Sequence, residues 1–273
     1  MFSVLILTKN EESNLADCLS TVSWCDDVVV LDSLSRDRTQ EIADESGARV
    51  FERSFDDFGS QRNYALDRIG FKYPWVFHLD ADERFNDTLK KECERVISLD
   101  ERSAYFIPNR IIFLGKWIRR SSQYPYPQVR LLKVGEVRFA KAGHGQREDQ
   151  AARGVGHIEV AYDHFNFSKG IADWVGKHNR YSDEEAVELI SLNLTKLDWS
   201  NLFKGSSIDR KRILKQLHAK MPCRWVLKFL YLYIWKRGFL DGYPGFVYCV
   251  LQGFYDFLIS AKVAENQIAK RSQ

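Results

Sequence analysis

The sequence predicts an α/β fold in which a twisted, mostly parallel sheet has helices on both faces, followed by a helical region. Three observations predict it. Short apolar runs alternate with helical patterns through the first hundred residues, a strand-rich segment follows over 104–165, and helical spacing dominates from about residue 168. We therefore expect one domain over residues 1–165 and a helical carboxyl-terminal region over residues 166–273.

Four short runs in the first hundred residues are typical of buried strands. They are rich in β-branched or aromatic residues and cover residues 2–7, 27–32, 48–52 and 75–80. Helical patterns separate them. Leu15, Leu19 and Val22 share one helical face, a second helix runs from Asp37 to Gly47, and a third ends at Gly70. The resulting alternation predicts strands that are parallel to one another.

The rest of the chain has a different pattern. Residues 104–115 and 128–134 are candidate extra strands. Residues 225–263 are strongly apolar and aromatic, but their longest stretch without a formal charge, residues 243–255, contains Pro244. That stretch is shorter than the roughly 20 residues that a membrane-spanning helix needs, so we expect no crossing of a bilayer.

Composition limits the class of protein. The chain has 273 residues, of which 45% are apolar, enough for a substantial core. Residues 1–100 contain 21 acidic and 12 basic side chains, whereas the remainder contains 16 and 28. Five cysteines without a CxxC pair give no disulfide framework or zinc cluster, which favours a reduced, cytoplasmic compartment. The first residues lack a basic leader, so no export is expected.

A cluster of carboxylates follows the fourth predicted strand. Asp80, Asp82 and Glu83 come directly after the apolar run, and Asp32 ends the second strand. Ligands of parallel α/β sheets bind beyond the carboxyl ends of the strands. Two aspartates one residue apart supply hard oxygen ligands for Mg²⁺ or Mn²⁺, and such a metal would neutralise a diphosphate. The alternative is that these acids only form a solvated turn and the start of a helix.

Several phosphate-binding motifs are absent. The chain has no G-x-G-x-x-G, no G-x-x-x-x-G-K-[ST] and no G-x-S-x-G, which disfavours dinucleotide binding, P-loop chemistry and the α/β-hydrolase elbow. Cations from Arg62, Lys177 or Arg180 could bind the phosphates instead. Lys177 and Arg180 lie three residues apart on one predicted helical face, where a solvated basic face is the alternative.

Four motifs in this order carry a family resemblance: "SVLILTKNEESNLADCLSTV", "DDVVVLDSLSRDRT", "FGSQRNYALD" and "FHLDADE". Together they resemble the small inverting glycosyltransferases of family 2, which have the GT-A fold. The match is strong over about residues 2–100 and looser beyond, through "HNRYS" and "GFLDGYPGF". Within the family the chain is most similar to bacterial enzymes of lipopolysaccharide-core and surface-polysaccharide assembly.

The resemblance implies roles for the strand-end residues. Asp32 would recognise the base, because a carboxylate can accept an N–H of a uridine-type base. Asp80 would face the ribose and Asp82 would hold the metal. The remaining donor-site groups would be Thr8, Asn10, Glu11, Arg62 and Asn63.

The second motif departs from the family at one position and has a local alternative. Leu34 stands where relatives often have glycine, which leaves the path of this loop open. For Asp37 and Thr39 we favour helix capping over a ligand role.

Inverting transfer also needs a base that removes the proton of the acceptor hydroxyl. The segment "KAGHGQREDQ", residues 141–150, resembles the family's His-Glu loop. Glu148 is the first candidate and Asp149 the second, and the alternative is an exposed charged turn. His144 could orient this loop. His164 could be a further metal ligand, although a single histidine is more often structural.

The carboxyl-terminal region has a composition suited to membrane surfaces. Residues 202–238 contain ten Lys or Arg and one acid, Asp209, together with several aromatic residues. Basic residues beside aromatic ones are typical of a helix that lies on anionic lipid, although the aromatic residues could instead pack on the sheet domain. Nucleic acid is disfavoured because the acidic first third of the chain would repel a polyanion.

The sequence therefore predicts a metal-dependent transferase that moves one sugar from a nucleotide-sugar, of the UDP type, to a lipid-linked or lipopolysaccharide-core saccharide. We place it at the inner face of the cytoplasmic membrane. The Q-x-x-R-W signature of polymerising relatives is absent. A D-x-D-x-[TV] phosphatase is a weak alternative because Arg84 stands where that motif needs Thr or Val. A membrane-associated assembly factor with a degenerate nucleotide-sugar site is the non-enzymatic alternative.

Overall fold

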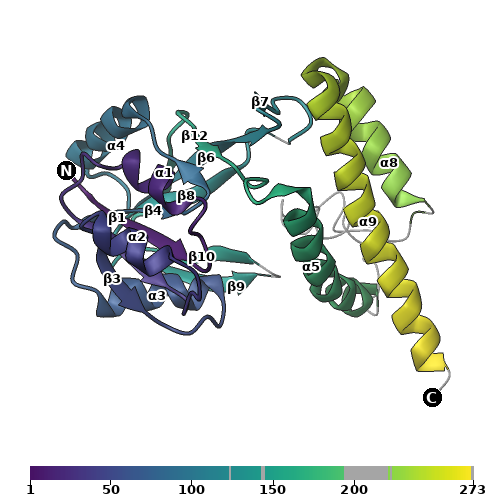
Figure 1. Ribbon diagram of the computed structural model, residues 1–273, viewed down its shortest axis with the longest axis horizontal. Helices are drawn as coiled ribbons and strands as arrows, with labels where there is room; N and C mark the ends of the chain where they lie inside the picture. Colours follow the sequence, from purple (N-terminus) through teal and green to yellow (C-terminus); the bar gives the residue numbers. More distant parts are fainter. Residues whose placement is uncertain (123, 143–144, 194–220, 222, 272–273) are drawn as a thin grey trace. The chain divides into compact units, whose positions relative to one another are not determined.

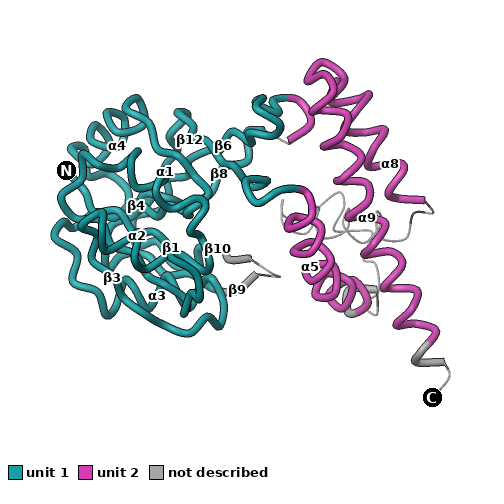
Figure 2. Tube along the Cα trace, viewed as in Figure 1, with its two compact units in different colours: residues 1–119, 123–170 teal, residues 120–122, 171–273 magenta. Residues whose placement is uncertain are grey.

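A computed structural model describes residues 1–122, 124–142, 145–193, 221 and 223–271 (Figure 1). The chain forms two compact units (Figure 2). The first comprises residues 1–119 and 123–170, and the second comprises residues 120–122 and 171–273. Each unit has hydrophobic core residues of its own.

The described part of the first unit contains a ten-stranded mixed sheet and a separate two-stranded hairpin. The strands of the sheet are β1 (Ser3–Thr8), β2 (Val28–Asp32), β3 (Arg49–Glu52), β4 (Trp75–Asp80), β5 (Glu83–Arg84), β6 (Ala104–Phe113), β7 (Lys116–Trp117), β8 (Pro127–Lys133), β11 (Val155–His157) and β12 (Tyr162–His164). The hairpin consists of β9 (Val137–Ala142) and β10 (Gly145–Ala151).

The order of the strands creates a switch point in the sheet. Strands β3, β2, β1 and β4 lie side by side in that order and are parallel, and β8 continues the sheet antiparallel to β4. The chain thus builds β2 and β3 on one side of β1 and then returns to place β4 on the other. Ligands of open α/β sheets bind outside the carboxyl ends of the strands at such a point. Thr8 ends β1 and Asp80 ends β4, so their side chains are placed there.

The predicted α/β fold and its four parallel strands are confirmed, and the two candidate extra strands are β6 and β8. The helices of the first unit are α1 (Leu15–Ser20), α2 (Thr39–Glu45), α3 (Phe58–Arg68) and α4 (Asp87–Leu99). Alternate residues of β1 face opposite sides, as the two-residue period of a strand requires. Val4 and Ile6 pack with core residues of α1 and α4, whereas Leu5 packs with those of α3.

Local sequence signals explain where these helices begin and end. Asp57 caps α3 by accepting a hydrogen bond from the Ser60 N–H at 2.9 Å, and Asn86 caps α4 in the same way for Leu89 at 3.0 Å. After α2, Gly47 adopts a φ of +77°, a left-handed conformation that glycine reaches without steric cost.

The second unit is helical in its described residues, as expected from the spacing after residue 168. Its elements are α5 (Gly170–Asn193), α8 (Arg224–Leu230), η1 (Tyr231–Trp235), η2 (Gly238–Asp241) and α9 (Gly242–Arg271). Ala186 and Leu189 of α5 pack against Ile259 of α9. Most of the basic segment 202–238 lies outside the described residues, so its predicted amphipathic helix on anionic lipid stays a prediction.

A buried aspartate joins a short outlying segment to this unit. The Asp241 carboxylate accepts hydrogen bonds from the backbone N–H groups of Arg120 and Ser121, at 2.9 and 3.0 Å, and from the Ser121 hydroxyl at 2.9 Å. Asp241 therefore explains why residues 120–122 belong to the second unit although residues on both sides belong to the first.

One helical segment, Gly238–Ile268, is long and apolar enough to cross a membrane by length and composition. The sequence-based expectation of no crossing thus stays a prediction. Only 28% of the most apolar window of this segment is buried in the protein, so it is not an ordinary core helix.

Candidate active site

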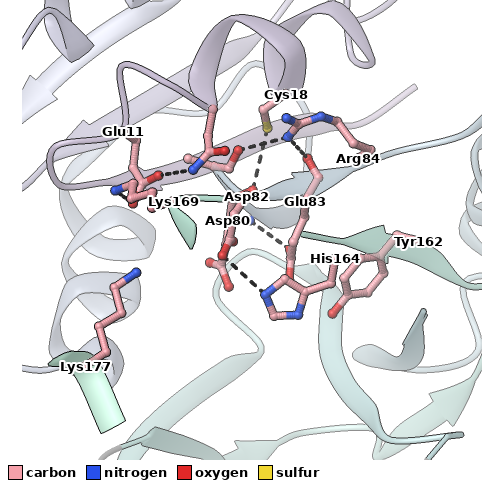
Figure 3. Close-up of polar contacts among 12 residues, drawn as sticks. Glu11, Cys18, Asp80, Asp82, Glu83, Arg84, Tyr162, His164, Lys169 and Lys177 are labelled. Atoms are coloured by element: carbon pink, nitrogen blue, oxygen red, sulfur yellow. Dashed lines mark hydrogen bonds and ion pairs between the residues drawn. The ribbon is translucent and has the colours of Figure 1, made fainter. Parts of the chain in front are cut away.

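The acidic end of β4 folds back on itself. After Asp80 the chain makes a turn into β5, and Glu83 accepts a hydrogen bond from the Asp80 N–H at 2.9 Å. The backbone of β12 pairs antiparallel with β5, and the N–H of Phe165 donates to the carbonyl oxygen of Asp82 at 2.8 Å. This pairing brings His164, which is distant in sequence, next to the acidic turn (Figure 3).

Asp82 and His164 face each other at this turn. The Nε2 atom of His164 lies 3.4 Å from Oδ2 of Asp82, and both side chains are about a quarter exposed (Figure 3). Burial lowers the pKa of His164, but the carboxylates of Asp82, Glu83 and Asp80 outweigh it and raise the pKa to about 9. The imidazole therefore carries a proton that pairs with Asp82 when no metal replaces it.

The donor atoms fit a divalent cation. Two neighbouring ligands of an octahedral Mg²⁺ or Mn²⁺ ion, each about 2.1 Å from the metal, lie roughly 3 Å apart, close to the separation of these two atoms. Carboxylate oxygen suits both ions, and imidazole suits transition metals. In the described part of the chain, no group of three or more His, Cys, Asp or Glu side chains is arranged to hold a metal. The remaining ligands would come from a diphosphate and water.

Two buried arginines hold Asp80. Its carboxylate accepts from Nη2 of Arg62 at 3.1 Å and from Nη2 of Arg130 at 2.9 Å. Burial would raise the pKa of Asp80, but the positive charges of Arg130 and Arg62 hold it below its usual value. Asp80 is therefore ionised and fixed in position at the end of β4.

Arg130 also binds the second buried acid. Its Nη2 atom lies 2.5 Å from Oε1 of Glu83, and its Nε donates to the hydroxyl of Tyr162 at 3.0 Å. Burial raises the pKa of Glu83 to about 7, although Arg130 opposes the shift. Glu83 is fully buried, so its role is to shape the turn that carries Asp82.

Arg62 has donors left beyond its contact with Asp80. Among the described residues, neither its Nε nor its Nη1 has a hydrogen-bond partner, and both ring nitrogens of His78 on β4 also lack one. Burial lowers the pKa of His78 well below its usual value, so the ring is neutral. Buried donors without partners are costly, which makes Arg62 a suitable group to bind a ligand at this strand end.

Asp32 organises the loop after β2. Its buried carboxylate accepts hydrogen bonds from four donors: the Thr8 hydroxyl at 2.8 Å, the Ser35 N–H at 2.7 Å, the Ser35 hydroxyl at 2.5 Å and the Gln40 amide at 2.9 Å. A carboxylate has about four acceptor positions. The predicted contact of Asp32 with a base stays a prediction, and it would require one of these donors to move.

The loops after β1 and β2 are joined to each other. The Asn10 side chain accepts from the Arg36 N–H at 2.8 Å, and the Glu11 N–H donates to the Thr39 hydroxyl at 2.7 Å. Asp37 accepts from the Thr39 N–H at 3.1 Å, but the N-cap of α2 is Arg38, which makes no side-chain capping bond, so helix capping by Asp37 and Thr39 stays a prediction. Leu34, where relatives often have glycine, keeps a left-handed φ of +59°. The loop therefore follows a path that glycine would adopt more easily.

Glu11 is bound by a residue from outside the four motifs. Nζ of Lys169 lies 2.7 Å from Oε1 of Glu11, and the Asn14 amide donates to the other oxygen at 2.7 Å (Figure 3). Lys169 also donates to the carbonyl oxygen of Asn10. The carboxylate of Glu11 thus fixes the loop after β1, and its predicted place along a nucleotide stays a prediction.

The segment that carries Glu148 is a strand and not a loop, which corrects the sequence-based expectation. Glu148 pairs with Phe139 across the β9–β10 hairpin, and a bulge follows at Asp149. Directly paired residues project their side chains from the same face. Phe139 faces β4, since its ring lies 5.7 Å from the ring of His78. Glu148 is therefore on the face turned toward β4, which favours it over the exposed Asp149. His144 lies outside the described residues.

Asn63 attaches this hairpin to α3. Its amide nitrogen donates to the Phe139 carbonyl at 2.8 Å, and its amide oxygen accepts from the Phe139 N–H at 3.0 Å. Asn63 thus positions the hairpin, and because its amide keeps a second N–H and a second acceptor position, its predicted contact with the donor stays a prediction.

Lys177 and Arg180 belong to α5 of the second unit. Lys177 forms an ion pair with Asp173 one helical turn earlier, at 3.1 Å. The predicted phosphate contacts of Lys177 and Arg180 therefore stay predictions.

Sequence reasoning missed Arg130 and Lys169. Arg130 is 2% exposed and lies inside the apolar strand pattern of residues 128–134. A lone arginine at a buried strand position needs an acidic partner. This requirement could have indicated that Arg130 forms an ion pair with Asp80 or Glu83. Lys169 carries no comparable signal, because it lies in a polar segment between elements.

A comparison with family models decides the assignment of the chain. The model described as glycosyl transferase family 2 matches residues 3–152, which is more than half of the chain. The chain belongs to this family. The matched residues include Asp32, Asp82 and Glu148, whereas His164 and Lys169 lie beyond them.

Relatives that are named glycosyltransferases match the chain over nearly their whole length. An uncharacterised glycosyltransferase of Rickettsia typhi is 27% identical over 283 residues, covering 99% of this chain and 89% of the relative. The lipopolysaccharide core biosynthesis glycosyltransferase LpsC of Rhizobium meliloti is 22% identical, covering 98% and 93%. The protein is thus a family 2 glycosyltransferase with relatives of the same extent.

Solved structures resemble the glycosyltransferase at a low level. TarS of S. aureus, residues 1–349 in complex with UDP-GlcNAc, has a TM-score of 0.49 at 14% identity and covers 100% of this chain and 92% of that one. Glucosyl-3-phosphoglycerate synthase of Mycobacterium tuberculosis, in complex with Mg²⁺ and UDP, has a TM-score of 0.46 at 16% identity, with 70% and 78% covered.

Proposed function

We propose that this glycosyltransferase transfers a single sugar, with inversion, from a UDP-type nucleotide-sugar to a lipid-linked or lipopolysaccharide-core saccharide. The observation that carries the proposal is the pairing of Asp82 with His164 at 3.4 Å, beside the arginine-held Asp80, at the switch point of the sheet. Relationship to a lipopolysaccharide core enzyme supports the choice of acceptor class.

The donor would lie along the ends of β1 and β4. Asp82 and His164 would hold Mg²⁺ or Mn²⁺, which when bound neutralises the diphosphate of the leaving nucleotide. Asp80, kept ionised by Arg62 and Arg130, would accept hydrogen bonds from the ribose hydroxyls. Arg62 would use its two remaining buried donors on the donor substrate.

Glu148 would act as the base. It lies on β10 on the face turned toward β4, where a carboxylate can accept the proton of an acceptor hydroxyl. Asn63 would keep this hairpin against α3 and so fix the position of Glu148 relative to the donor. Asp149 at the adjacent bulge is the second candidate.

The acceptor would be reached at a membrane surface. The basic and aromatic carboxyl-terminal region suits contact with anionic lipid at the inner face of the cytoplasmic membrane. A sugar acceptor carried on a lipid would then be held within reach of the catalytic unit.

A screen of nucleotide-sugars tests the donor. The thermal unfolding temperature is measured with each nucleotide-sugar in Mn²⁺ and in EDTA, for the wild type and for Asp82→Asn. We expect one UDP-sugar to raise the unfolding temperature of the wild type in Mn²⁺ only. Equal shifts with and without the ion, or in Asp82→Asn, would remove Asp82 from the metal site.

A second variant tests the base and the non-enzymatic alternative together. Glu148→Gln should keep the Mn²⁺-dependent binding of the donor and lose transfer, while Asp149→Asn, as the matched control, should keep both. Normal transfer by Glu148→Gln would exclude Glu148 as the base. Binding of UDP by the wild type without turnover of any donor would favour an assembly factor with a degenerate site.

A further inference from the structure

The second unit exposes an unusual set of apolar side chains where α8 passes through η1 and η2 into α9. We call six residues there the hairpin tip: Tyr231, Ile234, Trp235, Phe239, Leu240 and Tyr243. Trp235 is 80% exposed and Tyr243 is 73% exposed, which are extreme values for residues of this size. Single exposed apolar residues are common on soluble proteins, but a contiguous group marks an interaction surface.

An apolar stripe continues from the hairpin tip along α9. Phe246, Val250, Phe254 and Phe257 are all exposed and follow one another at spacings of four, four and three residues, so they share one helical face. Tyr248 and Ile259 on the opposite face are buried, whereas Phe246 and Phe257 on the stripe, although exposed, also contact aromatic rings of α8 and η1. This helix therefore has an inner face that binds its own unit and an outer face that is apolar where a solvated helix would be polar.

The hairpin is held together by a close approach of its two helices. A Cβ atom on Gly253 of α9 would lie 3.1 Å from the carbonyl oxygen of Trp225 on α8. Small residues that let helix backbones approach closely are common where helices pack in membranes. The apolar outer face is thus presented by a compact pair of helices.

The charges around the hairpin tip are of one sign. From residue 223 to residue 255 the only acid is Asp241, which is buried and binds Ser121. Lys228, Lys236 and Arg237 lie in the same stretch, the last two between Trp235 and Phe239. An apolar surface that is edged by cations, with no exposed acid within residues 223–255, complements an anionic lipid surface.

We propose that the hairpin tip and the apolar stripe of α9 are seated in the interfacial layer of an anionic phospholipid bilayer. Trp235 and Tyr243 take the headgroup level, where amphipathic rings are favoured, and Lys236 and Arg237 bind lipid phosphates. The hairpin tip and the stripe would be the surface that brings the enzyme to a lipid-borne acceptor, and this part of the inference rests on the proposed function.

The contacts of α9 favour lying in the interface over crossing the bilayer. Asp256 forms an ion pair with Arg224 at 3.5 Å, and Lys262 forms one with Asp183 of α5 at 2.6 Å. A spanning α9 would carry these charged groups to membrane depth. An interfacial α9 leaves them on the protein side, facing away from the lipid.

Flotation of the full-length protein with vesicles tests the surface. The wild type is expected to float with phosphatidylglycerol-rich vesicles and much less with phosphatidylcholine vesicles. Trp235→Ser/Tyr243→Ser should lower the partition coefficient by at least about tenfold, because binding scales with buried apolar area. Lys236→Gln/Arg237→Gln should lose the preference for the anionic vesicles. The matched control, Leu114→Ser/Tyr126→Ser, removes similarly exposed residues of the first unit and should float as the wild type does.

Three results would overturn the proposal. The first is equal flotation of the Trp235→Ser/Tyr243→Ser variant and the control variant. The second is no flotation of the wild type with either kind of vesicle. The third is a dimer of the wild type in solution that the Trp235→Ser/Tyr243→Ser substitutions dissociate, because this would assign the surface to a second copy of the chain. Mn²⁺-dependent UDP binding is measured in parallel without vesicles. If the surface proposal fails alone, UDP binding persists without flotation; if the proposed function fails alone, flotation persists without UDP binding.

Discussion

The guanidinium of Arg130 lies 2.9 Å from the carboxylate of Asp80, and both side chains are fixed at the point where β4 ends. The same nitrogen of Arg130 reaches Glu83 at 2.5 Å. One buried cation therefore ties together the two acids that flank Asp82 in sequence. Removing it would leave the buried carboxylate of Glu83 without its cation and Asp80 with Arg62 alone, which costs more than the ion pair contributes when intact.

We expect Arg130→Met to lower the free energy of unfolding by about 3–5 kcal/mol, because Asp80 and Glu83 lose a buried partner. Urea unfolding measures it. Arg95→Met is the matched control, since Arg95 pairs with Glu92 on the surface of α4 and its loss should change the free energy little. Equal effects of the two substitutions would contradict the buried network.

Asp32→Asn tests the loop after β2. The amide oxygen can still accept from the Ser35 N–H, but the NH2 group then faces the hydroxyls of Thr8 and Ser35, which now donate to the carboxylate. We expect a loss of about 1–3 kcal/mol in the free energy of unfolding at neutral pH. Burial raises the pKa of Asp32, but hydrogen bonds from Ser35, Gln40 and Thr8 outweigh it, so the folded pKa lies below the ordinary value of 3.8.

The direction of that shift fixes the pH dependence. The folded state binds this proton more weakly than the unfolded state, so the stabilisation is complete above 3.8 and is lost as the pH falls through the folded pKa. The difference in unfolding free energy between wild type and Asp32→Asn should therefore shrink in acid. A constant difference across the acid range would show that the carboxylate charge contributes nothing.

Leu34 has a left-handed backbone and a side chain that is 52% exposed. Leu34→Gly should change the free energy of unfolding by less than about 1 kcal/mol, because relief of the left-handed strain is offset by greater freedom of the unfolded chain. Leu34→Val should be clearly less stable, since β-branched residues disfavour this conformation. Thermal unfolding of both variants distinguishes them, and identical losses would argue against the left-handed path.

Asn63→Ala should loosen the β9–β10 hairpin. Both backbone groups of Phe139 lose their side-chain partner, so amide hydrogen exchange in β9 and β10 should accelerate while β1 and β4 stay protected. Arg138→Ala, which breaks the surface ion pair between the hairpin and Asp67, is the control and should change exchange far less. Unchanged protection in Asn63→Ala would remove its positioning role.

Much of the sheet could be predicted from the sequence because its signals are local. Each of the four apolar runs became a strand within one or two residues of its expected ends, and Gly47 follows its helix in the left-handed conformation. The two-residue period of a strand and the end of a helix depend on residues that are neighbours in sequence, so both can be predicted from one sequence.

The candidate site could be predicted only in part, because its contacts join distant segments. The acidic turn was visible in the sequence, but its partners Arg130 and His164 lie some 50 and 80 residues away in the chain. The hairpin was mistaken for a loop since its glycines and charged residues mask the strand pattern, and Asn63, which holds it, carries no local signal of that role.

Calorimetric titration of UDP into the protein, in Mn²⁺ and in EDTA, tests most directly whether Asp82 and His164 hold a metal that binds the nucleotide. We predict that the wild type binds UDP only in Mn²⁺. Loss of a residue that only supports a metal ligand typically weakens metal binding roughly 10–100-fold, so Asp82→Asn and His164→Gln, which remove ligands, should each weaken UDP binding by at least this factor. Binding of UDP with equal affinity in EDTA, or by both variants as by the wild type, would contradict the account.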